Sequence, residues 1–163
     1  MKHIKYLVSV VAASSVLSFA QFTQPAQAQV AYGSYVGVGP AVGFGDGVQV
    51  GAVIAGRYKF LELPISLRAQ AFLGRSAALV PTVSYDVPLN WQTDAYLGAG
   101  VVLASGDDPS PVGNKISFAL QPGVDYMVPN SNTVIFGNAI IAFDAIRDGG
   151  TAFSLQGGVG LRF

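Results

Sequence analysis

Few side chains in this sequence could do chemistry, and most of those are charged residues placed singly within apolar segments. The chain has no cysteine and one histidine, His3, near its start. A Ser-His catalytic pair and a His/Cys zinc site are therefore excluded for the rest of the chain. Pairs of carboxylates could still exchange protons with a substrate, but each has basic neighbours that are more simply explained as ion-pair partners. We expect no enzyme, and no catalytic residue, metal site or cofactor.

Two other motifs give weaker signals. The glycines of residues 37–43 resemble a nucleotide loop, but their spacing misses the dinucleotide fingerprint and no helix follows, so we expect no nucleotide. Asp107 and Asp108 could hold a divalent cation that bridges lipopolysaccharide. Two adjacent carboxylates are an incomplete calcium shell, however, and a solvated acidic loop is the simpler interpretation.

Composition narrows the class of protein. Of 163 residues, 51% are hydrophobic and 11% are charged, with nine Lys and Arg balancing nine Asp and Glu. Such hydrophobicity excludes a disordered chain, and the balanced charge offers no basic face for nucleic acid. The lack of cysteine excludes a disulfide scaffold. So few charges leave little to solvate the surface of an ordinary soluble domain.

Residues 1–28 have the order of a secretory signal peptide. A positive start with Lys2 and Lys5 precedes the apolar stretch 6–20, and a small-residue cleavage site follows at 26–28. A membrane anchor is the weaker alternative, because the apolar stretch is interrupted by serines and is short for a membrane span. We expect cleavage after Ala28, which removes His3 and leaves residues 29–163 outside the cytoplasm.

Apolar residues alternate with other residues along the remaining chain, which is typical of strands with two different faces. Eight such runs follow one another: 34–44, 48–60, 65–74, 79–87, 91–104, 117–128, 133–145 and 151–163. Turn residues separate them, and the one long connector is 105–116. Eight antiparallel strands with short turns form an up-and-down meander that can close on itself.

The two faces of these strands favour a membrane barrel. In the run 48–60, Val48, Val50 and Ile54 share one face, while Arg57 and Lys59 lie on the other. A soluble barrel or sandwich, the competing class, needs a wet outer face, and the face free of charges here is almost entirely apolar. One Arg or Lys on a lipid face costs about 2–4 kcal/mol near the bilayer midplane. We predict an all-β, eight-stranded antiparallel up-and-down transmembrane β-barrel with its polar face inside.

The inward charges then form a predicted network in the lumen. Its members are Arg57, Lys59, Arg68, Asp86, Asp94, Asp125 and Arg162. They lie near one set of strand ends, and charges so confined are tolerated only when they are paired and hydrogen-bonded. Near the other strand ends, Asp144 is the one inward charge, and residues such as Gly43, Gly51 and Ala119 are too small to fill the interior. We therefore expect a water-filled vestibule there, or else a barrel flattened until its opposite walls touch.

Aromatic residues and prolines add two expectations. An interfacial girdle is predicted at one set of strand ends by Tyr58, Phe60, Tyr85, Trp91, Tyr126 and Phe163. Three prolines fall inside predicted strands, where each removes a ladder hydrogen bond: Pro40, Pro81 and Pro122. We expect local bulges at these prolines, or strands that begin after them.

The last residues resemble the C-terminal assembly signal of bacterial outer-membrane β-barrel proteins, with Gln156, Gly158, Leu161 and Phe163 at the matching positions. Together with the leader and the eight strands, they make the chain similar to the small eight-stranded barrels of the OmpA/OmpX-like type. The resemblance implies a place in the outer membrane of a Gram-negative-type bacterium, contact with its lipid, and insertion by the barrel-assembly machinery. Connectors shorter than those of the adhesin-like relatives argue against adhesion.

Two functions remain open at this point. One is a structural or cell-surface role for a barrel whose lumen is filled by side chains. The other is a narrow, porin-like channel for small solutes. In either case an even number of strands places both ends of the barrel chain on the periplasmic side, and the long connector 105–116 outside the cell.

Overall fold

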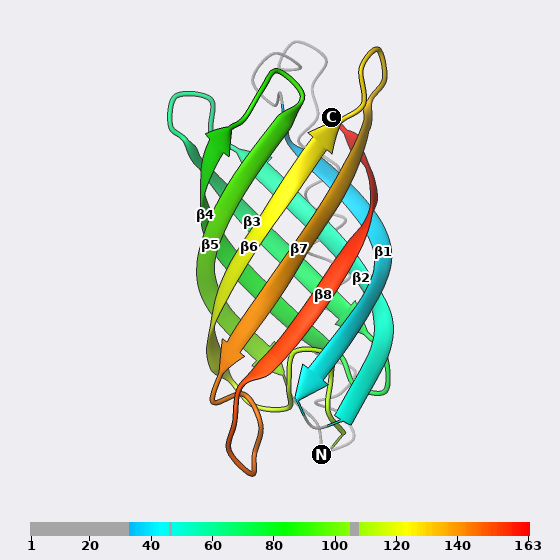
Figure 1. The fold of residues 1–163 in the computed structure, drawn as a ribbon, viewed down its shortest axis with the longest axis vertical. Helices are drawn as coiled ribbons and strands as arrows, with labels where there is room; N and C mark the ends of the chain where they lie inside the picture. The colour runs from blue at the N-terminus through cyan, green and yellow to red at the C-terminus, as the bar shows by residue number, and fades with distance from the viewer. Residues whose placement is uncertain (1–32, 46, 105–107) are drawn as a thin grey trace, which may run out of the picture. The chain divides into compact units, whose positions relative to one another are not determined.

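Eight antiparallel strands close into a barrel in which each strand pairs with its neighbours in sequence (Figure 1). The computed structural model describes residues 33–45, 47–104 and 108–163, so the expected signal peptide and Asp107 lie outside the described residues. The strands are β1 (Tyr35–Gly45), β2 (Gly47–Lys59), β3 (Ile65–Leu73), β4 (Ala78–Pro88), β5 (Thr93–Ala104), β6 (Ser117–Met127), β7 (Thr133–Phe143) and β8 (Ala152–Arg162). The described residues include no helix with the length and apolarity of a membrane span. The predicted eight-stranded up-and-down barrel is confirmed.

The first and last strands close the barrel. β1 pairs with β8 from Tyr35 opposite Arg162 to Phe44 opposite Phe153. Because the number of strands is even, β1 begins at the end of the barrel where β8 stops. We call this the C-terminal end; it carries connectors 60–64, 89–92 and 128–132, and the opposite one is the far end (Figure 1).

The strands are strongly tilted, as closure of a barrel requires. The tilt is visible in a row of directly paired residues that begins with Tyr58 at the C-terminal end. The row continues through Leu67, Val83, Ala99, Leu120, Ile141 and Phe153 to Phe44 at the far end. Following directly paired residues once around the barrel therefore leads from one end to the other. Because of this stagger, residues at different positions along their strands lie at the same height inside the barrel.

The predicted alternation of faces is present in the barrel. In β2, Val53, Ala55 and Arg57 are buried inside, whereas Val48 and Val50 are 65% and 70% exposed. The six predicted girdle aromatics are all exposed, and all lie at the C-terminal end of the barrel. A second set of exposed aromatics at the far end was not predicted: the pairs Phe44–Phe153 and Phe118–Phe143, with ring centroids 6.4 and 6.1 Å apart.

The three prolines lie inside strands without bulges, so both expectations for them are wrong. Pro40 pairs with Ala52 of β2, Pro81 with Ala69 of β3, and Pro122 with Leu97 of β5. On the other side of each strand the ladder is interrupted at the proline and then resumes in the same register. A proline lacks only its N–H, so one missing bond on one side is enough to accommodate it.

Two predicted strands are shorter than expected because turn geometry overrides the alternation. β5 begins at Thr93, since the Asn90 side-chain oxygen accepts a hydrogen bond from the Gln92 N–H (2.9 Å) and closes a turn. β7 ends at Phe143, and Asp144 adopts a positive φ of 52°. Trp91 and Asp144 therefore lie in connectors.

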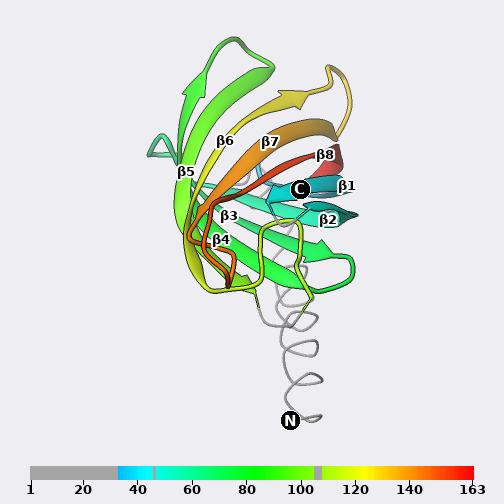
Figure 2. The ribbon, with the colours of Figure 1, turned by 60° about the horizontal axis from the view of Figure 1, so that its bottom comes forward.

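Part of the long connector packs against the far end. Residues 110–114 are buried, and Val112 is 1% exposed. The Asn114 N–H donates to the Ala145 carbonyl oxygen, and the Arg147 N–H donates to the Asn114 side-chain oxygen; both distances are 3.0 Å. Figure 2 brings this end forward and shows the yellow-green segment before β6 lying across the strand ends. Asp108 is exposed, as expected for a solvated acidic residue.

The inner face of the far half carries larger side chains than the sequence analysis assumed. Five apolar residues there are fully buried: Val53, Phe72, Val80, Val102 and Ile140. A cavity of about 10 Å³, room for one water molecule, lies at the far end between Gly43, Ser110 and Ile146. The expected vestibule lined by small residues is therefore wrong, because these large residues alternate with the glycines and alanines on the same strand faces.

Candidate functional site

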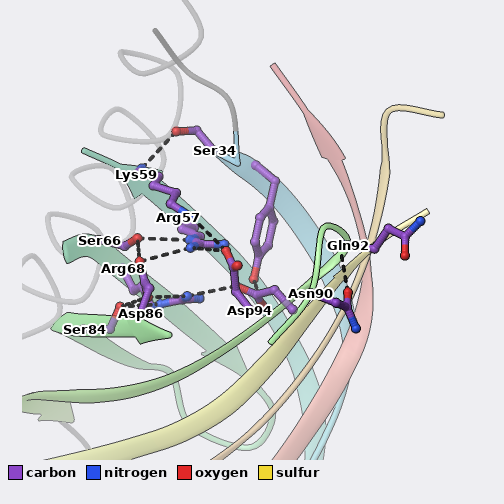
Figure 3. Close-up of polar contacts among 12 residues, drawn as sticks. Ser34, Arg57, Lys59, Ser66, Arg68, Ser84, Asp86, Asn90, Gln92 and Asp94 are labelled. Carbon is purple, nitrogen blue, oxygen red and sulfur yellow. Dashed lines mark hydrogen bonds and ion pairs between the residues drawn. The ribbon is translucent and has the colours of Figure 1, made fainter. Parts of the chain in front are cut away.

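Arg57 of β2 stands at the centre of a cluster of charges near the C-terminal end of the barrel (Figure 3). Its Nη2 donates to Asp86 Oδ2 (3.0 Å) and to Asp94 Oδ2 (2.9 Å). Its Nη1 donates to Asp125 Oδ2 (3.1 Å), and its Nε to Ser66 Oγ (3.1 Å). The guanidinium is fully buried, so each of these contacts compensates part of a large desolvation cost.

Arg68 of β3 holds two of the same carboxylates from the neighbouring strand. Its Nη2 donates to Asp125 Oδ2 (2.9 Å) and Asp86 Oδ1 (3.3 Å), and its Nε to Ser84 Oγ (2.9 Å). The guanidinium carbon lies 3.3 Å from the centre of the Tyr96 ring, which adds a cation–π contact. Arg57 and Arg68 are directly paired in the β2–β3 ladder, and shared carboxylates make this juxtaposition of like charges tolerable.

Hydroxyl groups complete the coordination of the carboxylates. The Tyr35 hydroxyl donates to Asp125 Oδ1 (2.8 Å), and the hydroxyls of Ser66 and Ser84 donate to Asp86. Asp94 accepts a second charged hydrogen bond, from Lys59 Nζ (2.9 Å), at the edge of the cluster nearest solvent. Buried carboxylates with several donors of this kind are fixed in position as well as neutralised.

The structure brings together six of the seven predicted network residues, three cations and three anions. The seventh, Arg162, pairs with Tyr35 in the β1–β8 ladder and so lies in the same inward-facing row as Tyr35 and Arg57. Its guanidinium donates to the Ser131 carbonyl oxygen in connector 128–132. Asp144 was expected to face inward at the far end, and it is exposed in a connector, paired with Lys115 (2.8 Å). The expectation for Asp144 is wrong because β7 stops before it.

Four contributors to the cluster were not singled out from the sequence: Tyr35, Ser66, Ser84 and Tyr96. Each lies on the charged face of its strand, so alternation could have identified it. For Tyr96 a further signal was available in Gly123 of the neighbouring strand, where an added Cβ would overlap the Tyr96 hydroxyl. A glycine beside a large aromatic residue indicates that the ring occupies the space of the missing side chain.

A layer of uncharged polar side chains lies next to the cluster. The Gln156 amide donates to the side-chain oxygens of Asn138 and Gln70, and the Thr82 hydroxyl donates to Gln121 (2.6 Å). These residues are buried and come from five strands, β3, β4, β6, β7 and β8. The polar interior therefore extends from the charges toward the apolar far half.

The arrangement suits static neutralisation of charge within a narrow interior. The carboxylates of Asp86, Asp94 and Asp125 each face at least one fixed cation. Within residues 33–45, 47–104 and 108–163, no three His, Cys, Asp or Glu side chains are grouped as a metal site would need. The chemistry that this geometry supports is the cross-linking of five strands by ion pairs.

The residues of the assembly-signal pattern occupy different environments in β8 and after it. Gln156 is buried in the polar layer, while Leu161 and Phe163 are exposed. Gly158 lies at the seam with β1, where an added Cβ would be 2.7 Å from the Val38 carbonyl carbon and 2.8 Å from the Gly39 Cα. The seam thus requires glycine at this position on steric grounds alone.

Comparisons with known proteins identify the fold. No protein-family model and no curated protein matches the sequence. Among solved structures, the chain is similar to Ail, the attachment invasion locus protein of Yersinia pestis, with a TM-score of 0.57 and 18% identity over 80% of this chain and 97% of that chain. It is similar to Neisserial surface protein A with a TM-score of 0.56 and 16% identity over 80% and 97% of the two chains.

A designed transmembrane β-barrel matches to the same extent, with a TM-score of 0.55 and 14% identity over 80% of this chain and 96% of the design. Each match covers about 80% of this chain and nearly all of the other chain, so the similarity spans the barrel as a whole. The chain therefore has the fold of a small, closed transmembrane β-barrel.

Proposed function

We propose that this chain spans the outer membrane as a barrel with a structural or cell-surface role, and that side chains close its lumen to solutes. The observation that carries the proposal is the neutral cluster of Arg57, Lys59, Arg68 and three aspartates, which links β2 and β3 to β4, β5 and β6 across the interior. The interior of an eight-stranded barrel is just wide enough for side chains to fill it. A cross-linked cluster at one level therefore obstructs passage.

The outer surface supports the same proposal. Apolar side chains cover both halves of the strands, and exposed aromatics lie at the two ends, separated along the barrel axis. Such a band between two aromatic girdles is the surface that a lipid bilayer accommodates. With its carboxylates held by cations, the interior offers no free acid–base pair among the described residues, which supports a role other than catalysis.

Conductance tests the closed lumen. The purified protein, inserted in planar bilayers, is expected to give currents close to the bare-membrane baseline, because in this proposal the ion-paired cluster obstructs the lumen. Heat-modifiable migration and protease resistance of the same preparation verify that the barrel is folded. Steady single-channel currents from verified, inserted protein would contradict the closed lumen and favour the alternative, a narrow channel for small solutes.

Orientation in the membrane is a separate prediction. Arg75 and Arg147 are exposed in far-end connectors, whereas Glu62, the one glutamate in the sequence, lies in connector 60–64 at the C-terminal end. If the C-terminal end faces the periplasm, trypsin added to intact cells is expected to cut after Arg75 or Arg147. Residues 110–114 of the long connector are buried and are therefore poor protease sites.

A glutamate-specific protease supplies the matched control. It is expected to cut after Glu62 only once the outer membrane has been permeabilised. In the unfolded chain, trypsin cuts after Arg75 and Arg147 and the glutamate-specific protease cuts after Glu62. Cleavage after Glu62 in intact cells that leaves Arg75 and Arg147 uncut would reverse the orientation.

A further inference from the structure

Two neighbouring connectors at the C-terminal end are unusually apolar for turns. They contribute an exposed set of side chains that we call the connector patch: Phe60, Leu61, Leu63, Leu89 and Trp91. Trp91 is 94% exposed, more than any other large hydrophobic residue described. The one charge in these two connectors is Glu62. Apolar side chains presented this openly to water are costly, and they indicate a surface that something covers.

The patch is held in place by the fold. The Asp86 N–H at the end of β4 donates to the Pro64 carbonyl oxygen (2.8 Å), which ties connector 60–64 to the strand that leads into connector 89–92. The Leu89 N–H donates to the Thr93 carbonyl oxygen (2.8 Å), and the Met127 N–H to that of Gln92 (2.7 Å). Trp91 therefore projects from a tight turn anchored on both sides.

The patch continues the lipid-facing surface of the strands beneath it. Tyr85 and Val87 of β4 are exposed just before connector 89–92, and Tyr58 packs edge-on against Phe60 with ring centroids 5.3 Å apart. Tyrosine and tryptophan favour the headgroup region of a bilayer, where an apolar ring and a polar atom are both accommodated. The chemistry of the patch thus matches the membrane interface.

The third connector at this end is different in kind. Connector 128–132 contains Asn130, Ser131 and Asn132, and Asn130 adopts a positive φ of 56° typical of a polar turn. It joins β6 and β7, on the side of the barrel away from β3 and β4, which lie between the two apolar connectors. The connectors of the C-terminal end are therefore apolar on one side of the barrel and polar on the other, although exposed apolar strand residues such as Leu161 lie on both sides.

We propose that the connector patch is a membrane-contact surface that lies within the lipid headgroup region, while connector 128–132 lies in water. The barrel then sits tilted, with its β3–β4 side deeper in the leaflet at the C-terminal end. This inference rests on the proposed membrane-spanning role, but it concerns one side of one end of the barrel, and it fails separately if the barrel inserts upright.

The experiment uses Trp91, the only tryptophan in the sequence, as its own reporter. The full barrel is reconstituted in phosphatidylcholine vesicles, with and without lipids brominated near the headgroup end of the acyl chain, and insertion is verified by protease resistance. The matched variant W91F/N130W moves the reporter to the polar connector, and W91F/L63W moves it to the other half of the patch. We expect Trp91 and the residue-63 reporter to emit at shorter wavelength than the residue-130 reporter and to lose intensity with brominated lipid. The residue-130 reporter is expected to be quenched by aqueous acrylamide and not by brominated lipid.

Each other outcome overturns the inference. Equal quenching of the Trp91 and residue-130 reporters by brominated lipid indicates an upright barrel, and acrylamide quenching of Trp91 in an inserted barrel places the patch in water. Protection of Trp91 from both quenchers indicates that a second copy of the chain covers the patch. A chain that fails to insert at all contradicts the proposed function itself.

Discussion

Replacing Arg57 with methionine is expected to destabilise the barrel by about 3–5 kcal/mol, the usual cost of removing one partner from a buried ion pair. The substitution leaves Lys59 as the one cation that contacts Asp94 in the cluster, and Arg68 as the one cation shared by Asp86 and Asp125. Methionine conserves most of the side-chain volume, so the loss reports the missing charge and donors. The free energy of unfolding in lipid vesicles, followed by Trp91 fluorescence during urea titration, measures it.

The matched control is Lys115→Met. Lys115 and Asp144 also form an ion pair of 2.8 Å, but their side chains are 37% and 72% exposed, and such a pair contributes about 0–1 kcal/mol. The double variant R57M/D125N should recover part of the loss, because it removes one negative charge and leaves the cluster with two cations and two anions. Equal stability of R57M and K115M would show that the cluster contributes little to the fold.

Replacing Gly158 with alanine is expected to impair closure of the barrel, with a loss of about 1–3 kcal/mol or more from overpacking. The added methyl group would overlap the Val38 carbonyl oxygen, and the atoms it meets belong to the backbone of β1, which cannot rotate away. β1 and β8 would have to separate at the seam that closes the sheet. The folded fraction after refolding into detergent micelles, measured by heat-modifiable migration, is the readout.

Gly137→Ala is the control, because a Cβ at that position of β7 meets no atom within 4 Å. Refolding in purified micelles contains no assembly machinery, so a loss confined to G158A reports sterics at the seam and not recognition of the C-terminal signal. If G158A refolds as fully as G137A, the glycine of the pattern serves the machinery, and the steric account of the seam is wrong.

The strands could be predicted from the sequence because each has a polar and an apolar face, and a period of two identifies such a strand without knowledge of its partners. Errors occur where a local turn competes with the alternation, as at Gln92 and Asp144. The prolines were misjudged for a related reason. Pro40, Pro81 and Pro122 each lose one bond on one side of a strand, and the pairing on the other side preserves the register.

The partners within the interior could be predicted less well. Which charges meet depends on the stagger between eight strands, and no single strand carries that information. Alternation placed Arg162 and Arg57 on the same inner face, but it could not show that the Arg162 guanidinium donates to the Ser131 carbonyl oxygen in connector 128–132. The far half was predicted to be roomy from its glycines and alanines, but Phe72 and Val102 lie on the same inner face and fill it.

The distribution of the cluster along the chain bears on how the barrel is assembled. All three of its cations, Arg57, Lys59 and Arg68, belong to the hairpin β2–β3, and all three of its anions come from β4, β5 and β6. An open sheet holds these opposite charges on separate segments, and neutrality arises only when the sheet curls and brings the segments face to face. A hairpin that entered the bilayer alone would carry three unpaired cations into hydrocarbon, at several kcal/mol each. Insertion strand by strand is thus penalised, and the barrel is favoured to cross the membrane already curled, as one cooperative unit.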